Sequence, residues 1–186
     1  MRRRLGLSAV WQALRLVTLS LGLLVGLGAC NFKWGSIGYN QGHSPDQPIA
    51  YSHELHAGTY KIQCLYCHGT AERANHASVP PLNVCMNCHS LIAANGKPAL
   101  ETLAKSYQDN QPVAWNKVHL LPDFVKFNHK RHVQHFGAPQ SCHKCHGPVE
   151  SMDVMYQYSS LSMGWCINCH RDSANKAPVT CSTCHY

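Results

Sequence analysis

Beyond residue 29 the sequence has few large aliphatic residues, and the whole chain contains 13 glycines and 10 prolines. A core made of protein side chains alone would therefore be small, which argues against an ordinary globular domain. Long apolar runs are scarce too, because the N-terminal run is uninterrupted only from Leu16 to Ala29, a length of 14 residues. That length is short for a membrane-spanning helix.

Acidic residues are few, nine against 16 lysines and arginines, and the formal net charge is +7. Four of the arginines lie in the first 15 residues, where there is no acidic residue. Beyond that segment twelve basic residues face nine acidic ones, a balance of +3. So small an excess says little about partners, and no nucleic-acid partner is expected.

Cysteine, by contrast, is abundant, with 11 residues in 186. Ten of them form five Cys-x-x-Cys-His motifs, which we number sites 1 to 5 in chain order: Cys64–His68, Cys85–His89, Cys142–His146, Cys166–His170 and Cys181–His185. Two thiols three positions apart share one face of a helical turn, so both can add to the vinyl groups of one haem. The following His then binds the iron, and the motif predicts five covalently bound haem c groups.

This interpretation assigns a role to each residue of the motifs. The cysteines expected to form thioether bonds are Cys64, Cys67, Cys85, Cys88, Cys142, Cys145, Cys166, Cys169, Cys181 and Cys184. The expected proximal iron ligands are His68, His89, His146, His170 and His185.

Zinc sites, redox cysteine pairs and disulfides are the alternatives. The 17 residues between Cys67 and Cys85 and the 20 between Cys145 and Cys166 fall within the zinc range. Haem is favoured because His follows the second cysteine in all five motifs, although only 14 residues are His. Five cysteine pairs also cannot be divided into four-ligand zinc sites without a remainder. The N-terminus moreover indicates export, and haem is attached covalently on the exported side of a membrane.

The expected fold class is a multihaem cytochrome c, mostly irregular with short α-helices and little β-structure, in which the haems form the core. One helix without a haem motif is predicted over 98–107. Pro98 suits the first turn, and Leu100, Leu103, Ala104 and Tyr107 recur at helical spacing. Residues 115–119 are predicted to be extended.

Residues 1–29 have the form of a lipoprotein-type signal peptide. A basic start precedes the apolar run, which ends in small residues before Cys30. This end resembles a bacterial lipobox, so Cys30 is expected to be lipidated and to become the mature N-terminus. The alternative is an uncleaved anchor helix from about Leu5 to Ala29, with Arg15 snorkelling. Either way, we expect membrane anchoring on the periplasmic side of a bacterial cell envelope.

The rest of the chain contains an internal repeat. An aromatic residue, a small polar residue and His-x-x-His precede site 1 and again precede site 3. The expected organisation is a tether over 30–50, a two-haem module over 51–89, a connecting segment over 90–126, and a second two-haem module with the fifth haem over 127–186.

The paired histidines of this repeat are the leading candidates for distal iron ligands. At i, i+3 two imidazoles project from one turn and can reach two haems, which places neighbouring haems close together. His119 is the first candidate for a fifth distal ligand, ahead of His76, Met163 and Met152. The remaining histidines near site 3, His135 and His143, are expected to be exposed. The expected distal set is His53, His56, His119, His129 and His132.

The paired motifs resemble multihaem class III cytochromes. Four longer stretches resemble the pentahaem cytochrome c subunit of alternative complex III: 51–58, 80–89, 118–129 and 163–170. The resemblance covers about residues 45–186. It implies a periplasmic electron-transfer subunit of a quinol-oxidising membrane complex, with a cytochrome c or a terminal oxidase as acceptor. It also supports distal ligation by His53, His56, His129 and His132, and it strengthens the case for His119 as the fifth distal ligand. In that family a transmembrane helix usually holds the subunit, whereas this apolar run ends in a lipobox.

The leading functional hypothesis is therefore electron transfer without substrate chemistry, so the chain is not expected to be an enzyme by itself. A free-standing multihaem lipoprotein shuttle is the first alternative. A multihaem reductase with an open haem is the second, but the sequence has no Cys-x-x-Cys-Lys motif and no shortage of histidines.

Overall fold

The structure is a computed structural model that describes residues 11–12, 14–20 and 39–186. The chain divides into two compact units, Met1–Ile37 and Gly38–Tyr186. The described residues of the first unit are helical, and no helix in the described part of the chain is long and apolar enough to cross a membrane. Cys30 and most of the expected signal peptide lie outside the described residues.

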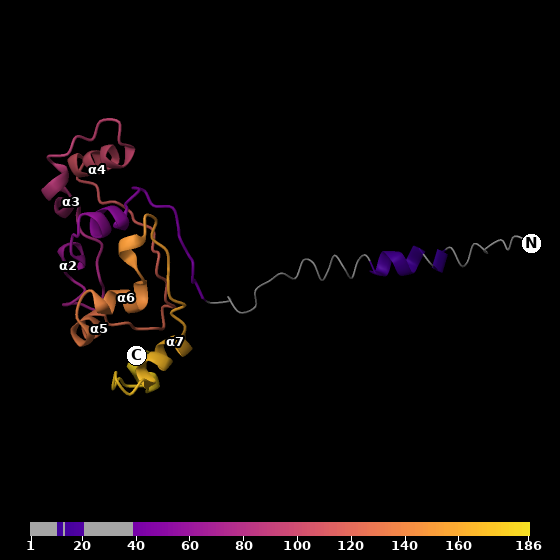
Figure 1. Cartoon of the computed structure of the whole chain (residues 1–186). Coiled ribbons are helices and arrows are strands. Elements are labelled where there is room, and N and C mark those ends of the chain that lie inside the picture. Colours follow the sequence, from indigo (N-terminus) through magenta and orange to yellow (C-terminus); the bar gives the residue numbers. More distant parts are fainter. Residues whose placement is uncertain (1–10, 13, 21–38) are drawn as a thin grey trace, which may run out of the picture. The chain divides into compact units, whose positions relative to one another are not determined.

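The second unit consists of short helices joined by irregular segments, and residues 39–186 contain no β-strand (Figure 1). In chain order the elements are the π-helix η2 (Glu54–Thr59), α2 (Cys64–Cys67), α3 (Leu82–His89), α4 (Pro98–Gln108), α5 (His129–Phe136), α6 (Gln140–His146), the 3₁₀-helix η3 (Val149–Ser151), α7 (Met163–Arg171) and the 3₁₀-helix η4 (Cys181–Thr183). The short α-helices and irregular segments that the sequence predicts are confirmed in this unit.

Local sequence signals explain where several helices begin. α4 carries Pro98 in its first turn, where the missing N–H costs nothing, and the helix predicted over 98–107 is confirmed. The side chain of Asn128 caps α5 by accepting from the N–H of Arg131. Ser162 caps α7 in the same way by accepting from the N–H of Trp165. Residues 115–119 contain no regular element.

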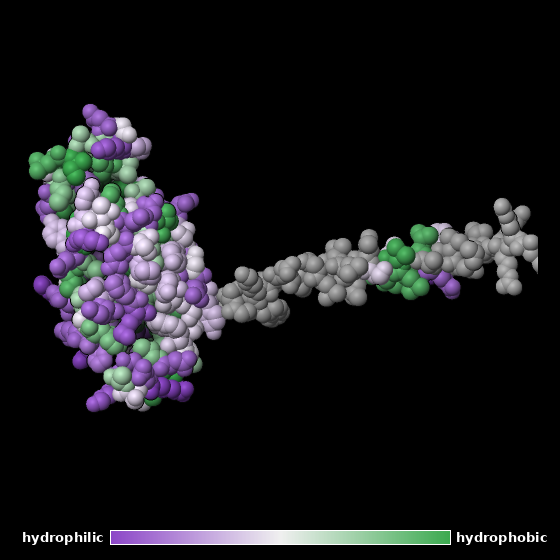
Figure 2. All heavy atoms as spheres, viewed as in Figure 1, coloured by the Kyte–Doolittle hydropathy of each residue, from purple (hydrophilic) through white to green (hydrophobic). Residues whose placement is uncertain are grey.

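The apolar core is small, as the composition indicates. The buried hydrophobic residues in the described part are Ile49, Ala71, Leu103, Val133 and Met152. Figure 2 shows a mostly hydrophilic or intermediate surface over the second unit, with hydrophobic residues gathered at the α3–α4 end. Polypeptide of this kind needs a further source of buried apolar area, and haem macrocycles would supply it.

The largest fully buried side chain is polar. Gln157 has 0% exposure, and its backbone carbonyl accepts from the N–H of Gly42 at 2.8 Å. Its Oε1 accepts from the N–H of Leu120 at 3.1 Å, and its Nε2 donates to the carbonyl of Ser159 at 3.1 Å. Gln157 therefore joins three segments that are far apart in the sequence, and its buried polar atoms are satisfied.

Candidate haem-binding sites

Each Cys-x-x-Cys-His motif lies on a helix or a single helical turn. α2, α3, α6 and α7 carry sites 1 to 4, and η4 carries site 5, so the two cysteines of a site lie about one turn apart. The ten cysteines of these sites have free thiols. Among the described residues, no three His, Cys, Asp or Glu side chains gather into a group that could hold a metal ion by themselves.

Three proximal histidines are oriented by backbone carbonyls that accept a hydrogen bond from Nδ1. The pairs are His68 with Ser78 at 2.8 Å, His170 with Pro178 at 2.7 Å and His185 with Phe124 at 3.0 Å. Such a bond fixes the tautomer and leaves Nε2 free to bind a metal. The acceptors lie 8 to 61 residues away in the sequence, so no local signal could have identified them.

The second histidines of the two His-x-x-His motifs are held in the same way. His56 donates from Nδ1 to the carbonyl of Ser52 at 2.8 Å, and His132 donates to that of Asn128 at 2.8 Å. Both acceptors lie four residues upstream. Both rings therefore offer Nε2 to a metal, and the repeat seen in the sequence is also a repeat of hydrogen bonds.

Aromatic rings fix the planes of the same histidines. Tyr51 stacks on His56 with ring centroids 4.4 Å apart, and Phe127 stacks on His132 at 4.3 Å. The interplanar angles are 20° and 27°. The aromatic residue that begins each repeat in the sequence thus packs on the second histidine of the repeat and restricts rotation of its imidazole.

Two pairs of histidines have the spacing expected for two rings on one iron. The ring centroids of His56 and His89 are 6.0 Å apart, and those of His132 and His170 are also 6.0 Å apart. Two imidazoles that share a metal, each bonded at about 2.0 Å, have centroids roughly 6 Å apart. The residues present therefore fit a bis-histidine haem at site 2 and another at site 4.

The first histidine of each motif lies against the other module. The N–H of His129 donates to the carbonyl of Asn75 at 3.0 Å, and its Nδ1 lies 2.9 Å from the same oxygen, so His129 contacts the loop that follows site 1. His53 precedes η2, where the N–H of Glu54 donates to the carbonyl of Met152 at 3.0 Å, in the segment that follows site 3. Both histidines thus lie where sites 1 and 3 meet.

Burial keeps this central group of histidines neutral. It lowers the pKa of His53 to about 4 and that of His146 to about 3, and it also lowers the pKa of His129. A neutral imidazole is the form that binds a metal. The Nδ1 atoms of His53 and His89 are buried and have no hydrogen-bond partner. These two rings differ in this respect from the other histidines expected to bind iron.

Neighbouring thiols give the order of the sites in space. Burial and then the Cys142 thiol raise the pKa of Cys64, which places site 1 beside site 3. After burial, the pKa of Cys67 is raised by the cysteines of site 2. The pKa of Cys145 is raised next by the cysteines of site 4, and that of Cys166 by Cys184 of site 5. The spatial order is therefore site 2, site 1, site 3, site 4 and site 5.

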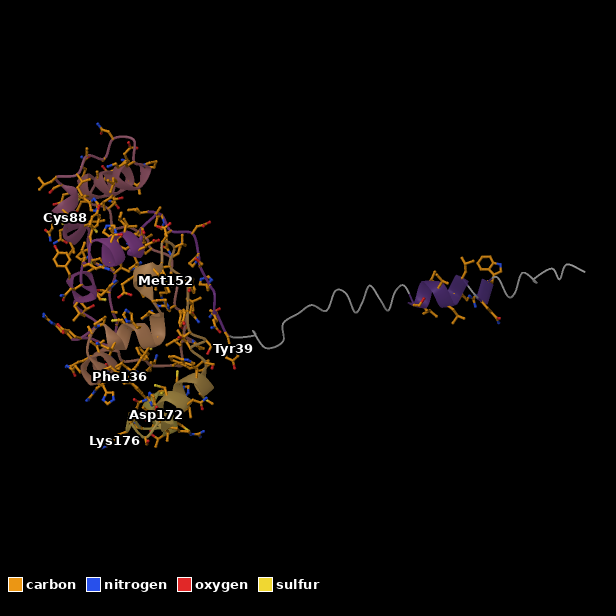
Figure 3. All side chains as sticks on the ribbon, viewed as in Figure 1. Tyr39, Cys88, Phe136, Met152, Asp172 and Lys176 are labelled. Atoms are coloured by element: carbon orange, nitrogen blue, oxygen red, sulfur yellow. The ribbon has the colours of Figure 1, made fainter. Side chains whose placement is uncertain are left out.

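The figures show the same order. The α3–α4 end lies opposite α7 and the C-terminus, with α2, α5 and α6 between them (Figure 1). Cys88 of site 2 is labelled near one end of the unit, and Asp172 and Lys176, which adjoin sites 4 and 5, near the other (Figure 3). The sites thus run from one end of the unit to the other rather than around a common centre.

The alternative candidates for a distal ligand are placed less favourably. His76 and His135 are exposed, and Met163 is 71% exposed. Met152 is buried with 4% exposure, in the small apolar core. His119 lies beside His146, with its Nε2 3.0 Å from Nδ1 of that ring.

His143 and Glu150 form a pair that sequence reasoning did not anticipate. His143 lies between the two cysteines of site 3 and was expected to be exposed, but it is half-buried. Its Nε2 lies 2.7 Å and 2.9 Å from the two carboxylate oxygens of Glu150. Burial raises the pKa of Glu150, but hydrogen bonds from its own backbone and from His143 outweigh burial, and the pKa is lowered.

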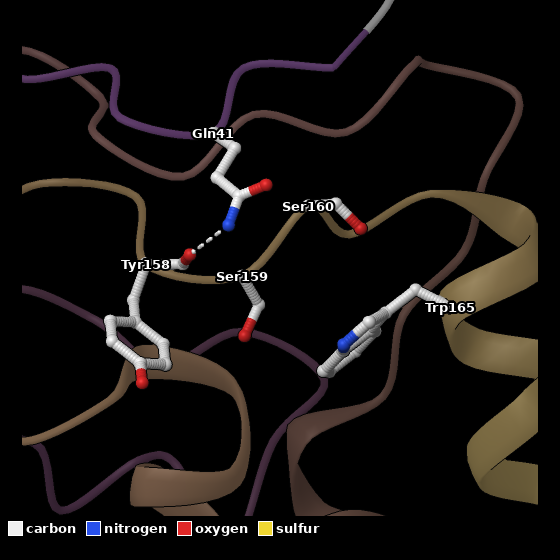
Figure 4. A pocket seen from close by; sticks show the side chains of 5 residues that line it. All are labelled: Gln41, Tyr158, Ser159, Ser160 and Trp165. Atoms are coloured by element: carbon white, nitrogen blue, oxygen red, sulfur yellow. Dashed lines mark hydrogen bonds between the residues drawn. The ribbon is translucent and has the colours of Figure 1, made fainter. Parts of the chain in front are cut away.

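Two hollows lie beside haem motifs. One of about 520 Å³ is lined by Ile62, Gln63, Tyr66 and Cys88 of site 2. The other, of about 410 Å³, lies next to the start of α7 and is lined by Gln41, Tyr158, Ser159, Ser160 and Trp165 (Figure 4). There the amide of Gln41 donates to the carbonyl of Tyr158 at 2.9 Å, which holds the N-terminal segment of the unit over this side of site 4.

The short helices, the five motifs and the paired histidines define a multihaem cytochrome c, a class of electron-transfer protein that binds haem c covalently. Comparison with known proteins agrees. Residues 125–186 match the family described as cytochrome c7 and related cytochrome c. The chain is also similar to a protein of Nitratidesulfovibrio vulgaris (strain Hildenborough) named "Menaquinone reductase, multiheme cytochrome c subunit". The two are 26% identical over 187 residues, which cover 89% of this chain and 87% of that protein.

Proposed function

We propose that the chain is a pentahaem electron-transfer subunit of a membrane complex that oxidises quinol, of the alternative complex III type. It would pass electrons to a cytochrome c or a terminal oxidase and would carry out no substrate chemistry itself. The haems bind through the ten motif cysteines, with the five motif histidines as proximal ligands. His56 and His132 are the distal ligands at sites 2 and 4, and His53 and His129 serve sites 1 and 3.

The observation that carries this proposal is the linear order of the five sites along one unit. Electrons that enter at one end can move between adjacent haems to the other end. Two histidines on one iron, as proposed for sites 1 to 4, keep the ligand set constant on reduction, which suits electron transfer. The small protein core supports the same conclusion, because the unit depends on its haems for buried apolar area.

The similar protein of Nitratidesulfovibrio vulgaris bears the name of a menaquinone reductase subunit. That name supports a quinone-linked membrane complex as the partner, and it favours a second candidate function in which electrons flow towards the quinone. The two candidates use the same chain of haems and differ only in direction.

The test is purification from the native membrane in mild detergent, followed by assays in both directions. Co-purification with integral subunits and reduction of cytochrome c by quinol would support the first candidate. Reduction of a quinone analogue at the expense of reduced cytochrome c would favour the second. If this chain purified alone, a free-standing shuttle would replace both, and a stoichiometric high-spin ferric signal would favour a reductase with an open haem.

We also propose that the chain is held on the periplasmic side of the membrane by lipid on Cys30. The lipobox-like end of the apolar run supports this. Intact-mass measurement of the mature protein should show five haem additions and a lipidated N-terminal Cys30. A mass that retains residues 1–29 would replace the lipid with an uncleaved anchor helix.

A further inference from the structure

His146 differs from the other ligand histidines in what its Nδ1 contacts. Six of them, at positions 56, 68, 129, 132, 170 and 185, have Nδ1 within hydrogen-bond distance of a backbone carbonyl. In contrast, Nδ1 of His146 lies 3.0 Å from Nε2 of His119. Site 3 lies at the middle of the spatial order. The partner of Nδ1 in its proximal histidine is a side chain, whereas those six histidines have a backbone carbonyl as partner.

The geometry of this pair does not suit two rings on one iron. The ring centroids of His119 and His146 are 4.2 Å apart, with an interplanar angle of 81°, against 6.0 Å for the pairs at sites 2 and 4. The two contacting nitrogens are 3.0 Å apart, whereas nitrogens on opposite sides of one metal are separated by about 4 Å. A separation of 3.0 Å is that of a hydrogen bond.

The direction of this hydrogen bond follows from the chemistry of the site. A ring that binds iron through Nε2 carries its proton on Nδ1, so His146 is the donor and Nε2 of His119 is the acceptor. His119 must then be neutral, with its own proton on Nδ1.

The backbone around His119 is fixed as well. The N–H of the next residue, Leu120, donates to Oε1 of Gln157 at 3.1 Å, and Gln157 is fully buried. The position of the His119 ring is therefore set by a buried hydrogen-bond network rather than by an exposed loop. This is the support that a residue needs if it is to orient another side chain.

We propose that His119 is a positioning residue for the proximal ligand of site 3, and that it is not a distal iron ligand. By accepting the Nδ1 proton, it fixes the plane of the His146 ring and increases the basicity of the nitrogen that faces the iron. A more basic ligand stabilises the ferric state, so His119 lowers the reduction potential of the haem at site 3. This inference rests on the proposed function, because it requires a haem at site 3.

The test compares His119→Phe and His119→Gln with wild type and with the control His76→Gln, which alters an exposed histidine. Electron paramagnetic resonance and redox titration are measured on each full-length, haem-loaded protein. In His119→Phe we expect every haem to keep the spin state that it has in wild type, one potential to rise and one set of g-values to change. The amide oxygen of His119→Gln can accept the same hydrogen bond, so this variant should have a potential and g-values close to those of wild type. The control should match wild type.

Three results would overturn the inference. A new high-spin ferric haem in both His119 variants would make His119 an iron ligand. Potentials and g-values unchanged in His119→Phe would show that the contact has no effect on the haem. If His119→Phe failed to mature, a high-spin His119→Gln would overturn the inference, and a low-spin His119→Gln with one shifted potential would support it. Failure of the proposed function is distinguishable, since wild type itself would then lack five haems or contain a high-spin one.

Discussion

At the scale of single residues, the environment of each histidine is set by a few specific contacts. Phe127 illustrates this, because its ring stacks on His132 and meets His129 edge-on, with centroids 4.8 Å apart. Tyr51 makes the corresponding contacts in the first module, with His56 and His53. One aromatic side chain thus orients two histidines that we propose serve two different sites.

Replacing Phe127 with Ala should therefore destabilise the folded protein. A fully buried Phe→Ala change costs about 3–5 kcal/mol, and Phe127 is half-buried, so we expect about 1–3 kcal/mol in a denaturant titration. The control Phe124→Ala removes a ring that is 67% exposed and should cost less. Equal losses in the two variants would show that stacking on His132 contributes nothing specific.

The pair His143–Glu150 predicts a dependence of stability on pH. The pKa of Glu150 is lower in the folded state than in the unfolded chain, so its stabilising effect is present above the unfolded value, about 4.3. That effect is lost as the pH falls through the folded pKa. Denaturation measured between neutral pH and pH 3 should therefore show a shallower acid loss in Glu150→Gln than in wild type.

The matched control for this prediction is Glu54→Gln, because Glu54 is exposed. Its pH profile should follow that of wild type over the same range. If Glu150→Gln gave the wild-type profile as well, the hydrogen bonds from His143 would not stabilise the ionised carboxylate.

At the scale of elements, two glycines allow other parts of the chain to pack closely against α6 and η2. Gly147 follows α6 with φ of 73°, a conformation that other residues rarely adopt. A side chain there would also collide with the ring of Tyr158. Gly58 lies in η2 against the backbone carbonyl of Glu150, so η2 and η3 pack closely only because this position has no Cβ atom.

Gly147→Ala should consequently lower stability by more than 1 kcal/mol, since backbone strain and a steric collision add. Gly164→Ala is the matched control, because Gly164 lies in the first turn of α7 and a Cβ atom there would contact nothing within 4 Å. Alanine should be neutral or stabilising at that position. The comparison is made by thermal unfolding, and a tolerated Gly147→Ala would contradict the packing described here.

The sequence predicted elements well where the determinants are local. Pro98 and the helical spacing of the residues after it located α4, and the Cys-x-x-Cys-His pattern predicted the fold class. The spatial order of the sites and the acceptors of the ring protons could not be predicted. Ser78, Pro178 and Phe124 act through backbone carbonyls, and a carbonyl is present at every residue, so its role depends on how the chain folds.

At the scale of the whole second unit, the proposed function makes each interior site a necessary link, because the sites follow one another in a line. Site 4 lies between site 3 and site 5, so replacing Cys166 and Cys169 with Ala should leave a protein with four haems in which site 5 is separated from the others. We expect quinone-linked electron transfer to fall to a small fraction of the wild-type rate. Steady-state turnover of the complex and haem content by intact mass are the measurements.

The corresponding control is chemical reduction by dithionite, which should reduce every remaining haem because the reductant reaches each one from solution. Turnover at the wild-type rate with four haems would show that electrons bypass site 4 and that the linear order does not define the route.

The contact between Cys64 and Cys142 has a consequence for symmetry. Two similar modules that meet head to head through their first sites would present two equivalent ends to their surroundings. The fifth site extends only one of these ends, where Asp172 and Lys176 are exposed, while the other end exposes Leu91. The two ends of the second unit therefore differ in the residues that they expose, and a donor and an acceptor would meet different surfaces.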